Sequence, residues 1–189
     1  MKTGLGLYKK YRILYAYLNL SRFWIRNQIL GFDVANQFLQ RVDKISVQII
    51  LKNNGASIGK DCDIETGLIF HNCKDYSNLI IGNNCHIGKN CFFDLRDTIT
   101  IGNNVVISMQ CTFITHVDLN KSTLCKKYPS HSSAMNIKDN SYLGARVTIL
   151  EDVQIGKNVI VAAGAVVVKN IEDDVLIGGV PAIVLKKIT

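Results

Sequence analysis

Two side chains in the middle of the chain are of types that transfer protons. His116 lies in the stretch 115-THVD-118, three residues after Phe113, and Asp94 directly follows Phe93. A neutral imidazole is suited to removing a proton from a weak nucleophile such as a hydroxyl at neutral pH. A carboxylate beside the imidazole would fix its tautomer and stabilise the imidazolium. This chemistry requires a fold that brings the two residues together.

A six-residue period in the hydrophobic pattern indicates the elements that position them. In 143-LGARVTILEDVQIGKNVIVAAGAVVVKN-170, aliphatic residues recur at Leu143, Ile149, Ile155, Val161 and Val167. This spacing fits neither a helix nor a lone strand, but it is typical of a parallel β-helix with three short strands in each coil. Adjacent coils lie about 4.8 Å apart, so the recurring side chains stack inside a triangular prism.

The same period runs through earlier parts of the chain and aligns the two candidate residues. It restarts at Ile137, and before that it marks Ile58, Ile64 and Phe70, then Ile81, Ile87 and Phe93, then Ile101, Ile107 and Phe113. Phe93 and Phe113 are therefore equivalent positions of neighbouring coils, so Asp94 can lie near His116. Asn and Gly after the marks, as in 81-IGNN, tolerate the positive φ that corners need.

The six cysteines are best explained as part of this core. Four of them occupy a second inward position, usually held by a small residue, where a thiol behaves as a compact hydrophobe: Cys62, Cys85, Cys91 and Cys111. No pair has zinc-ligand spacing with a histidine partner. We therefore expect reduced structural thiols and no metal. With no signal peptide and no apolar run of eighteen residues, the sequence predicts a cytoplasmic protein.

The net charge of +7 is confined to the first part of the chain. Residues 1–52 contain nine Lys or Arg and two Asp, whereas residues 53–189 contain thirteen of each sign. A nucleic-acid-binding surface would need a basic stripe on the folded solenoid, and the neutral solenoid argues against nucleic acid as a partner.

Residues 1–52 are predicted to form a helical leader. Apolar and aromatic residues recur at helical intervals in 8–30, and a second helix is expected in 33–51, separated from the first by Gly31. One interpretation is that the helices cap the first coil of the solenoid. The other is that residues 1–30, basic and aromatic, also contact an anionic membrane surface, which would place the protein peripherally at the inner membrane.

The period fails at three places, and such breaks are where function is expected. They are 71–80, 94–100 and the longest, 114–136. The longest break predicts an excursion loop at 117–136, because a polar segment of that length in a compact fold is usually functional or disordered. We expect this loop to shape an acceptor pocket with the side chains of Asp118, Lys121, Tyr128 and His131.

At these residues the sequence resembles a known family. The stretches 93-FDLRDTITIGNNVVISMQCTFITHVD-118, 141-SYLGARVTILEDVQIGKNVIVAAGAVVVKNI-171 and 178-GGVPAIVLKKI-188 resemble the hexapeptide-repeat O-acetyltransferases that modify galactosides, maltose and bacterial polysaccharides. The resemblance covers about residues 53–188. It implies a mainly β fold, a left-handed parallel β-helix, and a homotrimer that transfers acetyl from acetyl-CoA to a sugar hydroxyl. The matching histidine, His116, is the general base in that family, and the position of Asp94 often supports it.

Small residues near the longest break could bind the co-substrate acetyl-CoA. A bare backbone edge suits the narrow pantetheine arm, and it would be formed by Gly144, Ala145, Ala162, Ala163 and Gly164. The resemblance implies that the Ala145 amide contacts the acyl end as an oxyanion donor and that Tyr142 lies beside the channel. Lys169, Lys186 and Lys187 are placed for the phosphates. Ile183 replaces an arginine often found in the family.

Three other functions remain open at this point. His71, in 67-GLIFHN-72, resembles the neighbourhood of the catalytic histidine of serine acetyltransferases, although that family has a long helical N-terminal domain. A γ-type carbonic anhydrase would need three histidines on one zinc, and the spacings of His71, His86 and His116 do not match that family. A solenoid can also be a binding module without catalysis. The sequence does not identify the acceptor.

Overall fold

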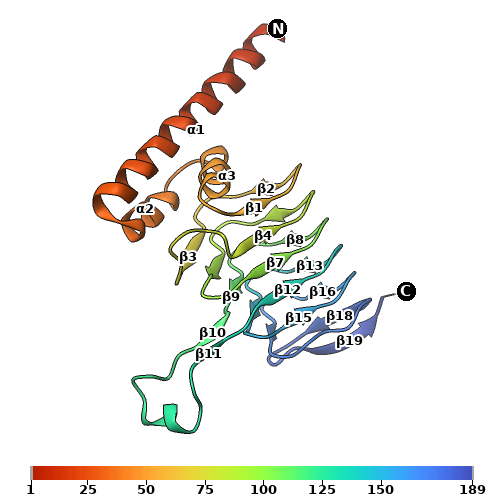
Figure 1. Cartoon of the computed structure of the whole chain (residues 1–189). Coiled ribbons are helices and arrows are strands. Elements are labelled where there is room, and N and C mark those ends of the chain that lie inside the picture. Colours follow the sequence, from red (N-terminus) through yellow and green to blue (C-terminus); the bar gives the residue numbers. More distant parts are fainter. Residues whose placement is uncertain (1, 189) are drawn as a thin grey trace.

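Short strands follow directly from the six-residue period, because each hexapeptide extends for two or three residues and then turns. The computed structural model describes residues 2–188, with side chains for residue 8 and residues 10–188. Successive coils stack into a parallel β-helix with helices at one end and the C-terminus at the other (Figure 1). The predicted parallel β-helix is confirmed.

The three faces of the prism are three parallel sheets, apart from one antiparallel strand at the C-terminal end. The first sheet contains β1 (Ser57–Ile58), β4 (Leu79–Ile81), β7 (Ile99–Ile101), β12 (Met135–Ile137) and β15 (Gln154–Ile155). The second contains β2 (Asp63–Ile64), β5 (His86–Ile87), β8 (Val106–Ile107), β13 (Tyr142–Leu143), β16 (Ile160–Val161), β18 (Val175–Gly178) and antiparallel β19 (Ile183–Lys187). The third contains β3 (Ile69–His71), β6 (Phe92–Asp94), β9 (Thr112–Phe113), β14 (Thr148–Ile149) and β17 (Val166–Val167).

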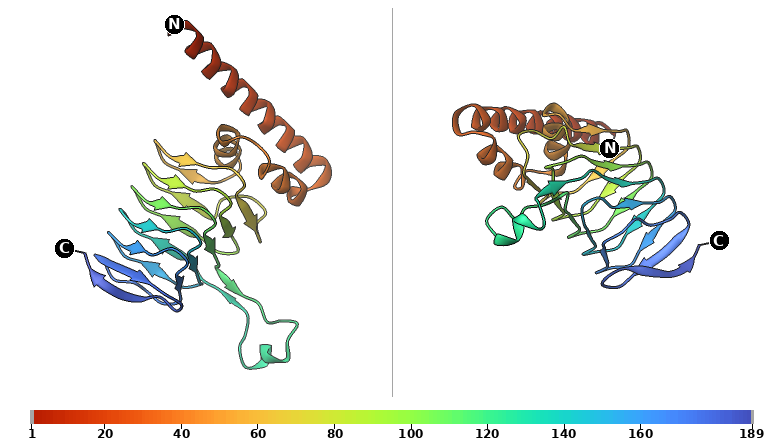
Figure 2. Two further views of the ribbon diagram at one scale, coloured as in Figure 1. Left: turned by 180° about the vertical axis from the view of Figure 1, so that it is seen from behind. Right: turned by 60° about the horizontal axis from the view of Figure 1, so that its bottom comes forward.

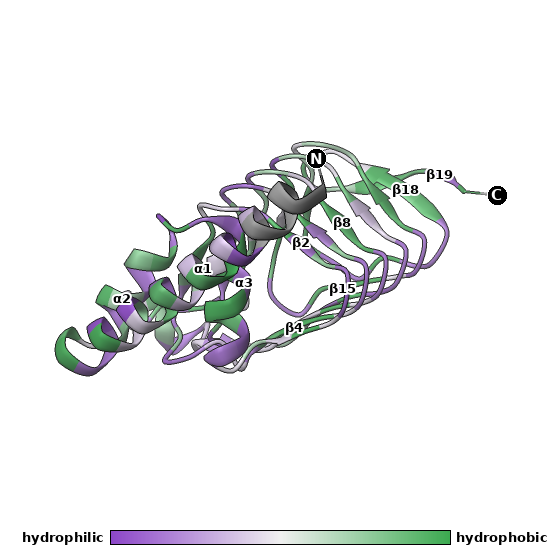
Figure 3. Cartoon of the chain, turned by 90° about the horizontal axis from the view of Figure 1, so that it is seen from above, coloured by the Kyte–Doolittle hydropathy of each residue, from purple (hydrophilic) through white to green (hydrophobic). Residues whose placement is uncertain are grey.

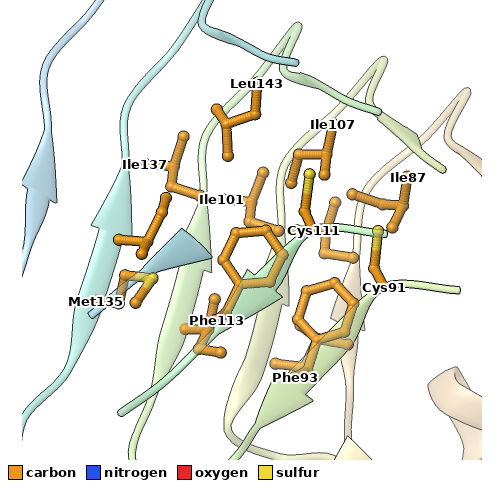
Figure 4. Close-up of a cluster of buried hydrophobic side chains, with 14 of the residues drawn as sticks. Ile87, Cys91, Phe93, Ile101, Ile107, Cys111, Phe113, Met135, Ile137 and Leu143 are labelled. Carbon is orange, nitrogen blue, oxygen red and sulfur yellow. The ribbon is translucent and has the colours of Figure 1, made fainter. Parts of the chain in front are cut away.

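Inward side chains stack in register from coil to coil. Phe70 pairs with Phe93 and Phe93 with Phe113, and the ring centroids are 5.5 and 4.8 Å apart. The close-up in Figure 4 shows Phe93 and Phe113 beside Cys91 and Cys111. Burial of each such aromatic or aliphatic side chain contributes about 1.5–3 kcal/mol, so the stacked columns provide most of the stabilisation.

The corners use asparagine and glycine for different purposes. Asparagine supplies the positive φ, as at Asn84 (φ 54°) and Asn104 (φ 55°), whereas the glycines of 81-IGNN and 101-IGNN do not. Gly82 is needed for space, because a Cβ there would lie 2.6 Å from the carbonyl oxygen of Gly102 in the next coil. The sequence-based expectation of positive φ was right for the asparagines and wrong for these glycines.

The inward cysteines pack as expected and also donate hydrogen bonds. The thiols of Cys85 and Cys111 are buried, and each lies within 3.3 Å of a backbone carbonyl oxygen of the following coil. All six cysteines are free thiols.

The N-terminal segment contains three helices: α1 (Lys2–Leu30), α2 (Phe32–Leu39) and α3 (Lys44–Asn53). The break at Gly31, which has φ 86°, agrees with the sequence-based expectation. The single helix expected over 33–51 is wrong, because the chain turns at residues 40–43. The turn is fixed by Asp43, whose carboxylate accepts hydrogen bonds from the backbone N–H groups of Ile45 and Ser46 and caps α3.

The helices join the first coil through an aromatic cluster and polar contacts. Phe23 of α1 lies 6.2 Å from Tyr76, whose ring is 5.1 Å from that of Phe70. Asn36 of α2 accepts a hydrogen bond from the Tyr76 hydroxyl and donates one to the Phe70 carbonyl. The helices thus cover the end of the solenoid, while a domain boundary at residue 52 stays a prediction. None of the helices in residues 2–188 is long and apolar enough to cross a bilayer.

The longest break forms a projecting hairpin between β9 and β12 (Figure 2). It contains β10 (His116–Val117), antiparallel β11 (His131–Ser132) and the 3₁₀ turn η1 (Thr123–Lys126). The expected loop at 117–136 therefore has secondary structure of its own, and β12 already begins at Met135.

Candidate active site

His116 and Asp94 meet where the third sheet turns towards the first. Asp94 ends β6. The neighbouring strand β9 ends at Phe113, and His116 begins the hairpin three residues later. The Nδ1 atom of His116 lies 2.5 Å from Oδ2 of Asp94. With Nδ1–H donated to the carboxylate, Nε2 of a neutral imidazole carries the lone pair. No hydrogen bond of Nε2 is found within residues 2–188, and one fifth of the side chain is exposed.

Asp94 is buried and surrounded by hydrogen-bond donors. Besides His116, its carboxylate accepts hydrogen bonds from the Thr115 backbone N–H (2.9 Å) and the Asn72 side-chain amide (2.8 Å). Burial by itself raises the pKa of Asp94, but the hydrogen bonds from His116, Asn72 and Thr115 outweigh it, so the pKa lies below its usual value. The site therefore holds an ionised carboxylate under an imidazole.

Two further residues of this network were not predicted from the sequence. Asn72 sits at a corner with φ 54°, and its side-chain oxygen lies 3.5 Å from the guanidinium of Arg96. Arg96 also contacts Asp118 at 3.3 Å. The clue in the sequence is that Asn72 and Arg96 lie in the two shorter breaks of the period, close to His71 and Asp94 respectively.

The four predicted acceptor residues do not gather around His116. Asp118 instead holds the hairpin together, because its carboxylate accepts hydrogen bonds from the Asn120 backbone N–H and the Ser130 hydroxyl. Tyr128 is exposed beside Lys127. His131 is exposed on β11, near the carbonyl of Pro129, and Lys121 is exposed in the hairpin. Among the described residues, no hydrogen bond or ion pair joins any two of these four side chains.

The other histidines have different surroundings. His71 is exposed and its ring lies 5.9 Å from that of Phe92, while no hydrogen bond to a carboxylate is found for it among the described residues. His86 lies on the second sheet, 3.3 Å from Asp63. Because the three histidines stand on different coils with different partners, they form no common cluster in residues 2–188.

The predicted acetyl-CoA residues lie on another corner, where the second sheet turns towards the third. Gly144 and Ala145 occupy this corner directly below Ala162, Ala163 and Gly164 of the next coil. A Cβ on Gly144 would lie 2.6 Å from the Ala163 nitrogen, so the coils approach closely there. Gly164 donates its N–H to the Ala145 carbonyl, but no hydrogen bond is found for the N–H groups of Ala145 or Ala163 within the described chain. Both remain available to a ligand.

The remaining predicted contacts are dispersed. The Tyr142 hydroxyl on β13 accepts a hydrogen bond from Ser108 at 3.1 Å. Lys169 is exposed just after β17, and Lys186 and Lys187 are exposed on β19. The His116–Asp94 pair and the small-residue corner lie at opposite ends of the strands of the third sheet. One chain therefore does not bring all the predicted residues together.

Comparison with known proteins agrees with the fold and the repeat. The family model of the bacterial transferase hexapeptide (six repeats) matches residues 134–169, and that of the hexapeptide repeat of succinyl-transferase matches residues 78–110. Galactoside O-acetyltransferase of Lactococcus lactis is 30% identical over 145 residues, which cover 74% of this chain and 66% of the relative. The Escherichia coli galactoside O-acetyltransferase is 28% identical over 170 residues, which cover 87% and 78%.

A solved structure extends the likeness over nearly the whole chain. The maltose O-acetyltransferase from Clostridium difficile superposes with a TM-score of 0.68 at 25% identity, covering 93% of this chain and 85% of that chain. The repeat, the coil architecture and the relatives agree with one another. The chain belongs to the hexapeptide-repeat acyltransferases.

Proposed function

We propose that the protein transfers an acetyl group from acetyl-CoA to a hydroxyl of a saccharide, such as a precursor of a polysaccharide, in the cytoplasm. The observation that carries this proposal is the His116–Asp94 pair, in which a buried carboxylate orients an imidazole whose Nε2 is open. O-Acetyl transfer needs a base for a poorly nucleophilic hydroxyl, and this pair has the geometry of such a base.

In the proposed reaction, Nε2 of His116 removes the proton of the acceptor hydroxyl as its oxygen attacks the thioester carbonyl. Asp94 stabilises the imidazolium that results, because the carboxylate stays ionised beneath it. The imidazolium then returns the proton to the departing thiolate as the carbon–sulfur bond breaks. The unpaired N–H of Ala145 supplies a donor for the oxyanion that forms between these steps.

This mechanism needs more than one chain. The catalytic pair and the Ala145 corner lie at opposite ends of the strands of the third sheet, so a single chain cannot direct both at one substrate. In a closed symmetric oligomer, the corner with His116 and Asp94 of one chain can lie against the Ala145 corner of its neighbour. We assign this arrangement to a homotrimer, with each acetyl-CoA bound between two chains.

A hollow next to the catalytic pair is the proposed acceptor site. It has a volume of about 260 Å³ and is lined by Asn72, Cys73, Lys74, Asp75, Asn78, Leu95 and Arg96. Asn72 belongs both to this hollow and to the hydrogen-bond network of Asp94. Five of the seven lining residues are polar or charged, and they offer hydrogen-bond partners for the hydroxyls of a saccharide. Asp118 contacts Arg96 of this lining in the same chain, whereas Lys121, Tyr128 and His131 would reach an acceptor across a subunit interface.

The proposal is tested by thiol release from acetyl-CoA with a panel of mono- and oligosaccharides, with L-serine as the competing acceptor. We expect saccharide-dependent release in the wild-type protein and release that is slower by about 10²–10⁴-fold in His116→Ala. Release that depends on serine and survives in His116→Ala but not in His71→Ala would overturn the proposal. Sedimentation equilibrium on the same samples checks the trimer, and an active monomer would contradict the shared site.

A further inference from the structure

Helix α1 uses only one of its sides to pack on the protein. Ala16, Asn19 and Phe23 are buried against α2 and α3, and Asn19 donates a hydrogen bond to Ser46 of α3. These residues follow one another at intervals of three and four, so they mark a single side of the helix. The other sides carry exposed residues, and the helix extends away from the strands of the solenoid (Figure 1). A large part of α1 therefore lies open.

The open side is apolar. A stripe of five residues faces away from the buried side, at helical intervals of three, four, seven and four: Tyr11, Leu14, Leu18, Ile25 and Ile29. Their exposed fractions lie between 48% and 73%. Figure 3 shows hydrophobic and hydrophilic residues in alternation along the helix, as expected for a helix with apolar residues on two opposite sides. Ser21 and Arg22 separate the two parts of the stripe, and exposed apolar side chains gathered on one side of a helix indicate a binding surface.

The sides of the stripe are basic and aromatic. Lys10 and Arg22 are exposed along its two borders, and the exposed aromatic rings near it belong to Tyr15, Tyr17 and Trp24. The sequence of α1 contains six Lys or Arg residues and no Asp or Glu. Tyrosine and tryptophan favour the boundary between water and lipid, and basic residues favour anionic headgroups.

A hollow continues the stripe towards α3. It has a volume of about 490 Å³ and is lined by Leu20, Ser21, Trp24, Ile25, Asn53 and Asn54. Ile25 belongs to both the stripe and the hollow, so the apolar surface is not limited to one row of side chains.

Charge decides which partner fits this surface. A second copy of α1 against the stripe would bring two helices together that carry basic residues and no acidic ones, and like charges at such an interface repel. An anionic lipid surface matches both the apolar stripe and its basic borders. We propose that α1 lies in the plane of a membrane containing anionic phospholipid, with the stripe of Tyr11, Leu14, Leu18, Ile25 and Ile29 inserted at the headgroup boundary.

The contact goes beyond the proposed acetyl transfer and does not depend on it. In a trimer, three copies of α1 would bind the same surface, so weak individual contacts would combine. A saccharide acceptor carried on a lipid would be concentrated at that surface.

Co-sedimentation of the full chain with phospholipid vesicles tests the proposal. We expect binding to vesicles of phosphatidylglycerol and phosphatidylcholine, little binding to phosphatidylcholine alone, and weaker binding as salt increases. Lys10→Gln/Arg22→Gln should lower the partition coefficient by about tenfold or more. Leu18→Gln/Ile25→Gln should lower it by a similar factor by removing apolar surface. Circular dichroism shows whether each variant folds.

The matched control removes the same charge from the solenoid. Lys138→Gln/Lys157→Gln alters two exposed lysines outside α1, and it should bind vesicles as the wild type does. The proposal would be overturned if this control lost as much vesicle binding as Lys10→Gln/Arg22→Gln. It would also be overturned if the folded wild type did not bind anionic vesicles at low salt. A larger assembly in solution that Leu18→Gln/Ile25→Gln dissociates without any effect on vesicle binding would overturn it as well, because a second copy would then cover the stripe.

Discussion

The imidazole of His116 and the carboxylate of Asp94 form a hydrogen-bonded pair in which Asp94 is buried and His116 is partly exposed. Asp94 is 1% exposed and receives donors from three residues, whereas His116 retains an unpaired Nε2 towards solvent. The buried carboxylate of Asp94 orients the imidazole and carries the negative charge. The more exposed His116 can exchange a proton through Nε2. This polarity is what a general base requires, and it gives each residue a distinct mutational signature.

His116→Ala should lower kcat by about 10²–10⁴-fold and leave the affinity for CoA nearly unchanged, because the substitution removes general-base assistance but no binding contact. Steady-state kinetics with a saccharide acceptor and calorimetric titration with CoA measure the two quantities. His71→Ala is the control and should retain wild-type turnover. If His116→Ala keeps more than a tenth of that turnover, the base lies elsewhere.

Asp94→Asn should lower the free energy of unfolding in a pH-dependent manner. The pKa of Asp94 is lowered in the folded state, so its ionised form contributes stability that is complete above the unfolded pKa and is lost as the pH falls through the folded pKa. We expect the variant to be about 1–3 kcal/mol less stable than wild type at pH 7, and this gap to shrink under acid conditions. Urea unfolding of both proteins at pH 7 and at acid pH measures the difference in their free energies of unfolding. A difference that is constant or grows towards low pH contradicts the lowered pKa of Asp94.

Asn72 is expected to act through Asp94 as a positioning residue. Asn72→Gly removes the amide donor while keeping a residue that tolerates φ 54°, so the backbone should be preserved. We predict a loss of about tenfold in kcat and an altered pH dependence of kcat/KM, because the carboxylate loses a donor. Asn84→Gly is the matched control, since Asn84 has the same φ of 54° at an exposed corner. Equal kinetic effects in both variants would mean that only corner stability had changed.

The fold was predictable because the solenoid repeats one local rule. Each mark of the six-residue period, from Ile58 to Val167, specifies an inward side chain without reference to distant parts of the chain. The contact between His116 and Asp94 followed from the same rule, since Phe93 and Phe113 are equivalent positions of adjacent coils. Where the period stops, no such rule exists.

Contacts within the breaks depend on tertiary structure and were missed. Asn72 and Arg96 come from two separate breaks, and only the stacked coils bring them within reach of Asp94 and Asp118. The role of Asp118 in acceptor binding stays a prediction, but the sequence did not reveal that its carboxylate also holds the hairpin closed. The turn before α3 is not evident from the hydrophobic pattern, because Asp43 fits a continuous helix in sequence and its role as the N-cap of α3 is seen only in the structure.

Ala145→Pro tests the proposed oxyanion donor without changing any side-chain contact of His116 or Asp94. Ala145 precedes Arg146, whose φ of 61° is typical of the third residue of a type II turn, so Ala145 holds the second position, where proline is common. Its N–H forms no hydrogen bond within the described chain, and proline removes only that donor.

We therefore expect Ala145→Pro to fold with a stability close to that of wild type but to lose about 10–10³-fold in kcat, with a smaller change in KM for acetyl-CoA. Met109→Pro is the matched control, because Met109 occupies the same corner one coil earlier and precedes Gln110, which also has φ 61°. Thermal unfolding separates a folding defect from a catalytic one. A folded Ala145→Pro protein with wild-type turnover would exclude this amide as the donor and leave the N–H of Ala163, on the same corner, as the next candidate.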